Sequence, residues 1–131
     1  MNNQITKLLR DRAEDIWNKI LNHPFVTELF TGSLPLDKFR FYVIQDYNYL
    51  ITLTKCQALI ASKFEDPVIM RKVLELALAD VTTELENYNK LLNTLGLSIN
   101  EVIKSRPSPP TNTAYMNFLL TTCALGSPYE A

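Results

Sequence analysis

The stretch that decides the fold is residues 39–50, with the sequence FRFYVIQDYNYL. Its apolar and aromatic residues surround nearly the whole circumference of a helix, which is typical of a helix covered by its neighbours. One carboxylate, Asp46, stands in its middle, with Tyr42, Tyr47 and Tyr49 close by in sequence. Because an isolated buried charge is costly, such a carboxylate normally has a partner or binds something. Asp46 is therefore the first candidate for a binding residue.

Proline, glycine and capping residues on both sides of this stretch predict an all-α chain. Expected helices run from about residue 5 to 22, 25 to 31, 35 to 63, 67 to 95 and 113 to 125, with a short one starting at the capping box of residues 98–101. Gly32, Gly96 and Gly126 stand where three of these helices should end. No segment alternates in the manner of a strand, and residues 106–110 form a proline-rich loop.

Length and composition predict a single domain, residues 1–131, with a packed core, since 47% of the residues are hydrophobic. The net charge of −1 and the absence of a basic run argue against direct nucleic-acid binding. No apolar run approaches the roughly 20 residues that span a bilayer, so we expect no membrane partner. The two cysteines do not form a disulfide framework, and the expected location is the cytoplasm.

Helical geometry places Asp46 on a face with other polar and aromatic residues: Tyr42, Tyr49, Leu50, Leu53 and Gln57. One interpretation is a ligand anchor, because a carboxylate accepts two hydrogen bonds side by side from an amidine-like edge such as that of an aminopyrimidine. The other is structural: Asp46 pairs with a lysine or arginine of another helix, or accepts a tyrosine hydroxyl. The residues alone favour neither.

Glu84 falls on the apolar stripe of the helix over residues 67–95, and we interpret it as an edge glutamate reaching solvent or a structural ion pair. Two inward carboxylates can also indicate a di-iron bundle, but that site needs Glu-x-x-His pairs. The only histidine, His23, is not in one, so no metal site is expected. His23 should instead cap carbonyls at the end of the first helix.

Cys56 lies ten residues beyond Asp46, about 15 Å along the same helix, and cannot share a compact site with it. Cys123 has no histidine or lysine near it in sequence to lower its pKa. We expect both to be buried thiols, so spacing alone yields a pocket candidate and no catalytic machinery.

Several segments match a known family in order and spacing: residues 23–26 (HPFV), 32–35 (GSLP), 37–39 (DKF), 42–46 (YVIQD), 106–109 (RPSP) with 114–115 (AY), and 124–126 (ALG). The chain resembles the TenA/THI-4 family, the thiaminase II enzymes of thiamin salvage. The resemblance implies an all-α, haem-oxygenase-like helical bundle, of which these residues would be the N-terminal part.

The resemblance also implies a site. Asp46 would bind the aminopyrimidine ring, and Tyr49 and Tyr115 would line the same pocket. The implied reaction is hydrolytic C–N cleavage at the exocyclic methylene of thiamin or of an aminopyrimidine derived from it. It would need no metal or organic cofactor, and the family is commonly a homotetramer.

One departure from the family pattern matters more than the match. The family nucleophile, a cysteine in the next helix, is expected about two helical turns past Ala131, so no catalytic residue is assigned within the chain. Residues 127–130 (SPYE) look like a helix start, which suggests a chain truncated at its C-terminus. The alternative is a non-catalytic, aminopyrimidine-binding or regulatory member, since some relatives carry a label as transcriptional activators.

Overall fold

The computed structural model describes residues 3–104 and 108–130. Within these ranges it consists of helices and short connections without a strand, so the all-α prediction is confirmed. The chain divides into two compact units, residues 1–39 and 40–131. Among the described helices, none is long and apolar enough to cross a membrane.

The first unit contains α1 (Asn3–Arg12), α2 (Glu14–Leu21) and α3 (Pro24–Thr31). The predicted single helix over residues 5–22 is wrong, because the chain turns more tightly at Ala13. The Ala13 N–H bonds the Arg10 carbonyl three residues back, at 3.1 Å, instead of the carbonyl four residues back. The Arg10 guanidinium then lies over the Trp17 ring, 4.4 Å from its centroid, across the break.

His23 caps a helix, but not the one that its position predicted. Its Nδ1 accepts a hydrogen bond from the N–H of Phe25 at 3.2 Å, so it caps the start of α3 rather than carbonyls at the end of α2. The first turn of a helix has free N–H groups, and an acceptor at this position satisfies one of them. As predicted, Pro24 occupies the first turn of α3, and Gly32 ends it with φ 71°.

The second unit is built on α4 (Leu36–Ala61), which begins just before it, and contains α5 (Pro67–Ala79), η1 (Asp80–Glu84), α6 (Leu85–Thr94), α7 (Ile99–Lys104) and α8 (Pro110–Leu125). The predicted caps are present: Asp66 accepts from the Val68 N–H at 2.8 Å, and Ser98 and Glu101 form the capping box at 2.7 and 3.3 Å. Helix α8 begins three residues earlier than expected, at Pro110. Part of the predicted proline-rich loop lies outside the described residues.

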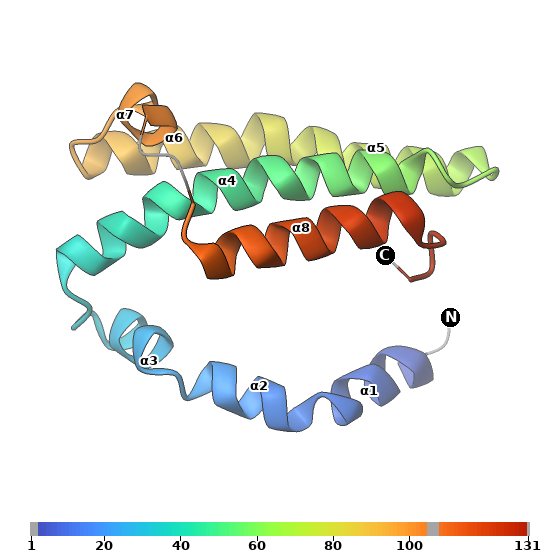
Figure 1. Ribbon diagram of the computed structural model, residues 1–131, viewed down its shortest axis with the longest axis horizontal. Coiled ribbons are helices and arrows are strands. Elements are labelled where there is room, and N and C mark those ends of the chain that lie inside the picture. The colour runs from blue at the N-terminus through green and yellow to red at the C-terminus, as the bar shows by residue number, and fades with distance from the viewer. Residues whose placement is uncertain (1–2, 105–107, 131) are drawn as a thin grey trace. The chain divides into compact units, whose positions relative to one another are not determined.

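Helix α4 lies between α8 on one side and α5 with α6 on the other (Figure 1). The Tyr88 hydroxyl of α6 donates to the Val43 carbonyl at 2.7 Å, and Arg40 donates to the Leu95 carbonyl at 2.8 Å. These pairs make α4 and α6 antiparallel. On the other side Asn112 of α8 donates to the Gln45 carbonyl at 3.3 Å. The buried apolar side chains lie along both interfaces: Val43, Cys56, Ala61, Ala77, Tyr88, Leu92, Leu95 and Cys123, with Val102 of α7.

The helix predicted over residues 67–95 contains a π turn, η1, and this turn corrects its predicted apolar stripe. Side chains that are buried or half-buried recur at three- and four-residue steps before and after the turn, but five residues separate Asp80 from Leu85: Met70, Val73, Ala77, Asp80, Leu85, Tyr88, Leu92 and Leu95. A π turn holds one residue more than an α turn. Asp80 therefore takes the inner position, while Val81 is 43% exposed and Glu84 is exposed.

Candidate functional site

Asp46 is half-buried on α4, and its neighbour one turn earlier, Tyr42, is hydrogen-bonded to it. Burial raises the pKa of the Asp46 carboxyl above its usual value, and the Tyr42 hydroxyl partly offsets this by donating to the carboxylate. Burial also raises the pKa of Tyr42, as do the charge of Asp46 and that hydrogen bond. Asp46 is thus a carboxylate that burial penalises and one phenol partly stabilises.

The structural alternative named two kinds of partner for Asp46, a lysine or arginine of another helix or a tyrosine hydroxyl. Arg40 donates to the Leu95 carbonyl, and Lys63 donates to the carbonyls of Ala124 and Gly126. In residues 3–104 and 108–130 the ion pairs are Lys7 with Asp11 and Arg71 with Glu75, all well exposed side chains. Of the structural partners considered, a tyrosine hydroxyl is therefore the one that Asp46 has.

Tyr49 and Tyr115, the other two predicted pocket residues, stack on each other between α4 and α8. Their ring centroids are 5.9 Å apart and their planes differ by 15°. Burial raises the pKa of Tyr49, followed by the effects of Tyr115, to which its hydroxyl is hydrogen-bonded, and the charges of Asp46 and Asp80. We call Tyr42, Asp46, Tyr49 and Tyr115 the Asp46 cluster. The structure brings all three predicted binding residues into this cluster.

Tyr47, although adjacent to Asp46 in sequence, belongs to a different contact. Its ring lies 5.7 Å from that of Tyr88, whose hydroxyl is bonded to the Val43 carbonyl. The pKa of Tyr88 is raised by burial first and then by the charge of Asp46. This pair joins α4 to α6 and is best explained as packing.

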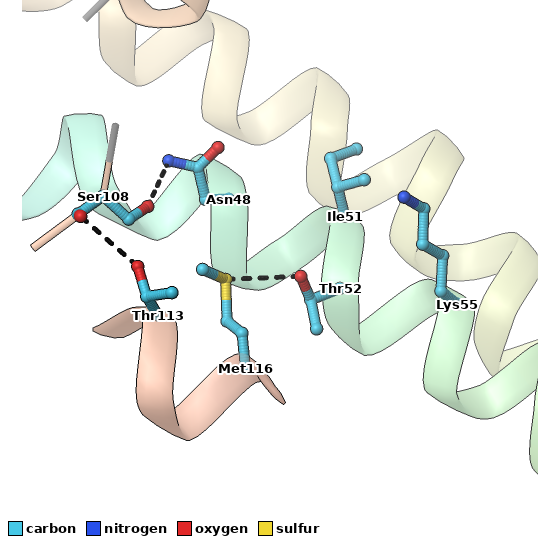
Figure 2. Close-up of a pocket in the computed structure, with 7 residues that line it drawn as sticks. All are labelled: Asn48, Ile51, Thr52, Lys55, Ser108, Thr113 and Met116. Carbon is cyan, nitrogen blue, oxygen red and sulfur yellow. Dashed lines mark hydrogen bonds between the residues drawn. The ribbon is translucent and has the colours of Figure 1, made fainter. Parts of the chain in front are cut away.

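The opposite face of α4 carries a solvent-open groove of about 390 Å³ that none of the predicted binding residues lines (Figure 2). Its walls come from α4, from α8 and from the residues before α8: Asn48, Ile51, Thr52, Lys55, Ser108, Thr113 and Met116. Asn48 donates to the Ser108 hydroxyl at 2.8 Å, and Thr52 donates to the Met116 sulfur at 3.3 Å. Its polar side chains thus largely satisfy one another across the α4–α8 interface.

Cys56 and Cys123 are buried and face each other between α4 and α8. The pKa of Cys56 is raised to about 11, by burial first and then by Cys123. A thiol with so high a pKa is a poor nucleophile near neutral pH. The prediction of two buried thiols is confirmed.

Asp80 is a candidate binding residue that the sequence patterns did not identify. One oxygen, Oδ2, is buried and has no hydrogen-bond partner among the described residues. Two further buried acceptors of α4, the Oε1 atoms of Gln45 and Gln57, also have no hydrogen-bond partner among the described residues. A sequence signal did exist: Asp80 follows the buried Ala77 by three residues, a helical step, and only the π turn separates it from the next inner residue. Glu84 is exposed, in agreement with an edge glutamate.

The described residues contain no group of three histidine, cysteine, aspartate or glutamate side chains placed to hold a metal ion. What the Asp46 cluster offers is a carboxylate acceptor beside aromatic faces and hydroxyls. Such a set suits a flat, nitrogen-containing ring with N–H donors on one edge.

Comparisons of the chain with a family profile and with individual proteins agree on one family. The profile of the TENA/THI-4/PQQC family matches residues 10–131. The chain is 32% identical over 127 residues to an aminopyrimidine aminohydrolase of Helicobacter pylori, covering 97% of this chain and 58% of that protein. It is 34% identical over 119 residues to an aminopyrimidine aminohydrolase of Halalkalibacterium halodurans, covering 91% of this chain and 53% of that one.

A solved structure described as a TenA homologue protein from P. horikoshii OT3 superposes with a TM-score of 0.90 at 50% identity. The match covers 96% of this chain and 58% of that one. The chain therefore spans little more than half the length of the curated and solved relatives with which it is compared.

Proposed function

The chain belongs to the TENA/THI-4/PQQC family, and we propose that it forms the aminopyrimidine-binding part of a thiamin-salvage hydrolase of the thiaminase II type. The observation that carries the proposal is Asp46, a half-buried carboxylate without an ion-pair partner among the described residues. The names of the two curated relatives, both aminopyrimidine aminohydrolases, supply the class of ligand.

In this proposal Asp46 accepts hydrogen bonds from a ring nitrogen edge and the adjacent amino group of the pyrimidine. The Tyr42 hydroxyl, already bonded to the carboxylate, holds its orientation. Tyr49 and Tyr115 line the pocket and offer ring faces and hydroxyls to the bound ring. In a site from which water is excluded, the Asp46 charge also polarises the ring.

The proposed reaction is hydrolysis of the C–N bond at the exocyclic methylene of the aminopyrimidine. We assign no catalytic residue within residues 1–131 and expect the nucleophilic cysteine outside them. The burial of Cys56 and Cys123, together with the raised pKa of Cys56, supports leaving both out of the chemistry. We assign no metal or organic cofactor.

For the whole protein we propose a cytoplasmic homo-oligomer, a tetramer as is common in the family, without direct contact to nucleic acid. Exposed apolar side chains on α8 support an assembly, since Phe118 is 65% and Leu125 83% exposed. The net charge of −1 supports the absence of nucleic-acid binding.

Ligand-dependent melting of the purified protein tests the proposal. An aminopyrimidine alcohol should raise the melting temperature, while the same pyrimidine without its amino group should raise it much less, because binding to the folded state stabilises it. The rise should be lost in Asp46→Asn. No rise in the wild-type protein at millimolar ligand would rule out an aminopyrimidine site.

A further inference from the structure

The π turn η1 places a second carboxylate toward α4. In an uninterrupted α-helix the inward side chains recur every three or four residues. Here five residues separate the inward Asp80 from the inward Leu85, and the π turn accounts for the extra residue. Single π turns inside α-helices are rare and are found frequently at functional sites. The turn keeps Leu85 and Tyr88 packed inward while it also holds Asp80 inward.

The Asp80 side chain has an acceptor that the described chain does not use. Its Oδ2 is buried without a hydrogen-bond partner, and neither ion pair found in residues 3–104 and 108–130 includes Asp80. A buried carboxylate oxygen in this state carries an uncompensated loss of hydration. A donor from outside the described residues would remove that penalty.

The antiparallel pairing of α6 with α4, in which Tyr88 meets Val43 and Arg40 meets Leu95, places η1 opposite the stretch of α4 that follows Asp46 and includes Tyr49. The negative charge of Asp80 and that of Asp46 both act on the Tyr49 hydroxyl, from η1 and from α4 respectively. The Tyr49 hydroxyl itself is hydrogen-bonded to Tyr115, so Tyr49 does not occupy the free Asp80 oxygen.

We propose that Asp80 is a specificity-determining residue of the Asp46 cluster, which accepts a hydrogen bond from a cationic amine on the bound pyrimidine. The inference rests on the proposed function, because it takes Asp46 as the residue that holds the amino-bearing edge of the ring. A primary alkylamine is protonated near neutral pH and has only donors, which suits an acceptor-only carboxylate. A hydroxymethyl group in the same position is neutral and gains much less from that charge.

The test compares two derivatives of one aminopyrimidine, aminomethyl and hydroxymethyl, by titration calorimetry on the purified protein. Wild type should bind the aminomethyl compound more tightly. Asp80→Asn, which keeps the size of the side chain and removes its charge, should weaken the aminomethyl compound about tenfold or more, as expected for a charged hydrogen bond. It should leave the hydroxymethyl compound within about twofold, since a neutral group depends little on the charge.

Glu84→Gln is the matched control, since it removes a carboxylate from the same turn at an exposed position. It should leave both affinities unchanged. Equal weakening of both compounds by Asp80→Asn, no weakening, or the same selective loss in Glu84→Gln would each overturn the proposal for Asp80. Equal affinity of the wild-type protein for the aminomethyl and the hydroxymethyl compound would also overturn it.

The two proposals fail in different ways. If wild type binds neither compound, the aminopyrimidine site is wrong and the role of Asp80 falls with it. If wild type binds both compounds and Asp46→Asn weakens both while Asp80→Asn changes nothing, only the role of Asp80 is wrong. Asp80→Asn should fold, because it keeps the size of a half-buried side chain whose Oδ2 has no hydrogen-bond partner among the described residues, and its circular dichroism and melting temperature verify this.

Discussion

The polar side chains on the two faces of α4 differ in the hydrogen-bond partners that they find. On the groove face Asn48 and Thr52 find partners on or just before α8, namely Ser108 and Met116. On the Asp46 face the carboxylate has a single phenol as its partner, and the nearby Gln57 Oε1 is buried without one among the described residues, as is the Gln45 Oε1 of the same helix. Polar groups that satisfy each other stabilise a fold, whereas a buried acceptor without a partner is open to a donor from water or from a ligand.

The largest expected effect is a loss of ligand affinity when the Asp46 face is changed, compared with no loss when the groove face is changed. Asp46→Asn should weaken an aminopyrimidine about tenfold to a hundredfold, because hydrogen bonds to a charged group contribute roughly 1.5–3 kcal/mol. Titration calorimetry measures the change. Lys55→Met, which alters the charged residue of the groove face, should leave the affinity unchanged. If Lys55→Met costs as much affinity as Asp46→Asn, the ligand binds on the other face.

A change on the groove face should cost stability and no affinity. Ser108→Ala removes the acceptor of the Asn48 amide, a contact of 2.8 Å, and should lower the free energy of unfolding by about 1 kcal/mol. Urea denaturation gives the stability, and calorimetry with the aminopyrimidine gives the affinity. A loss of affinity without a loss of stability would mean that the satisfied face contributes to the site.

The stacked tyrosines should have a smaller effect on binding than Asp46. Tyr49→Phe keeps the ring stack with Tyr115 and removes the hydroxyl, so it should weaken the aminopyrimidine about threefold, the size of one neutral hydrogen bond. Tyr129→Phe is the control, because Tyr129 is 86% exposed and contacts only the edge of Phe64 among the ring pairs observed. Equal affinities of Tyr49→Phe and wild type would limit Tyr49 to a packing role.

The smallest effect concerns the cost of ionising Asp46. The pKa of Asp46 is raised in the folded state, so its ionisation lowers the stability of the fold. This loss of stability is absent below the unfolded pKa of about 4 and complete above the folded pKa. Without ligand, Asp46→Asn should therefore melt slightly higher than wild type at pH 7, and the difference should vanish as the pH falls below about 4. Melting curves of both proteins across this range measure it. A difference that grows toward acid pH would contradict the raised pKa.

Local signals in the sequence predicted most helix ends correctly. Asp66, Ser98 and Gly32 act through hydrogen bonds and backbone angles within a few residues, so their roles can be inferred without the rest of the fold. The break at Ala13 has no proline or glycine to announce it, and a continuous apolar pattern hid it. His23 was assigned to the wrong helix because it follows one helix and precedes another.

The site was predictable in part for the same reason. Asp46, Tyr42 and Tyr49 share one helix, and helical periodicity places them together. The place of Tyr115 came from the family resemblance, and the structure shows its ring on Tyr49. The three-residue step from Ala77 marks Asp80 as an inward position, but the π turn that keeps both Asp80 and Leu85 inward could not be predicted, because it depends on the packing on its two sides and the sequence of η1 contains no residue that forces one.

The π turn also makes chain length a determinant of the site. Deleting one residue between Asp80 and Glu84 would restore an ordinary α-helix, in which everything on one side of the deletion rotates by about 100° relative to the other. Either Asp80 or the packed pair Tyr88 and Leu92 would then leave its place against α4. A loss of three nucleotides here would therefore displace either Asp80 or the packed pair, although it substitutes no residue of the Asp46 cluster.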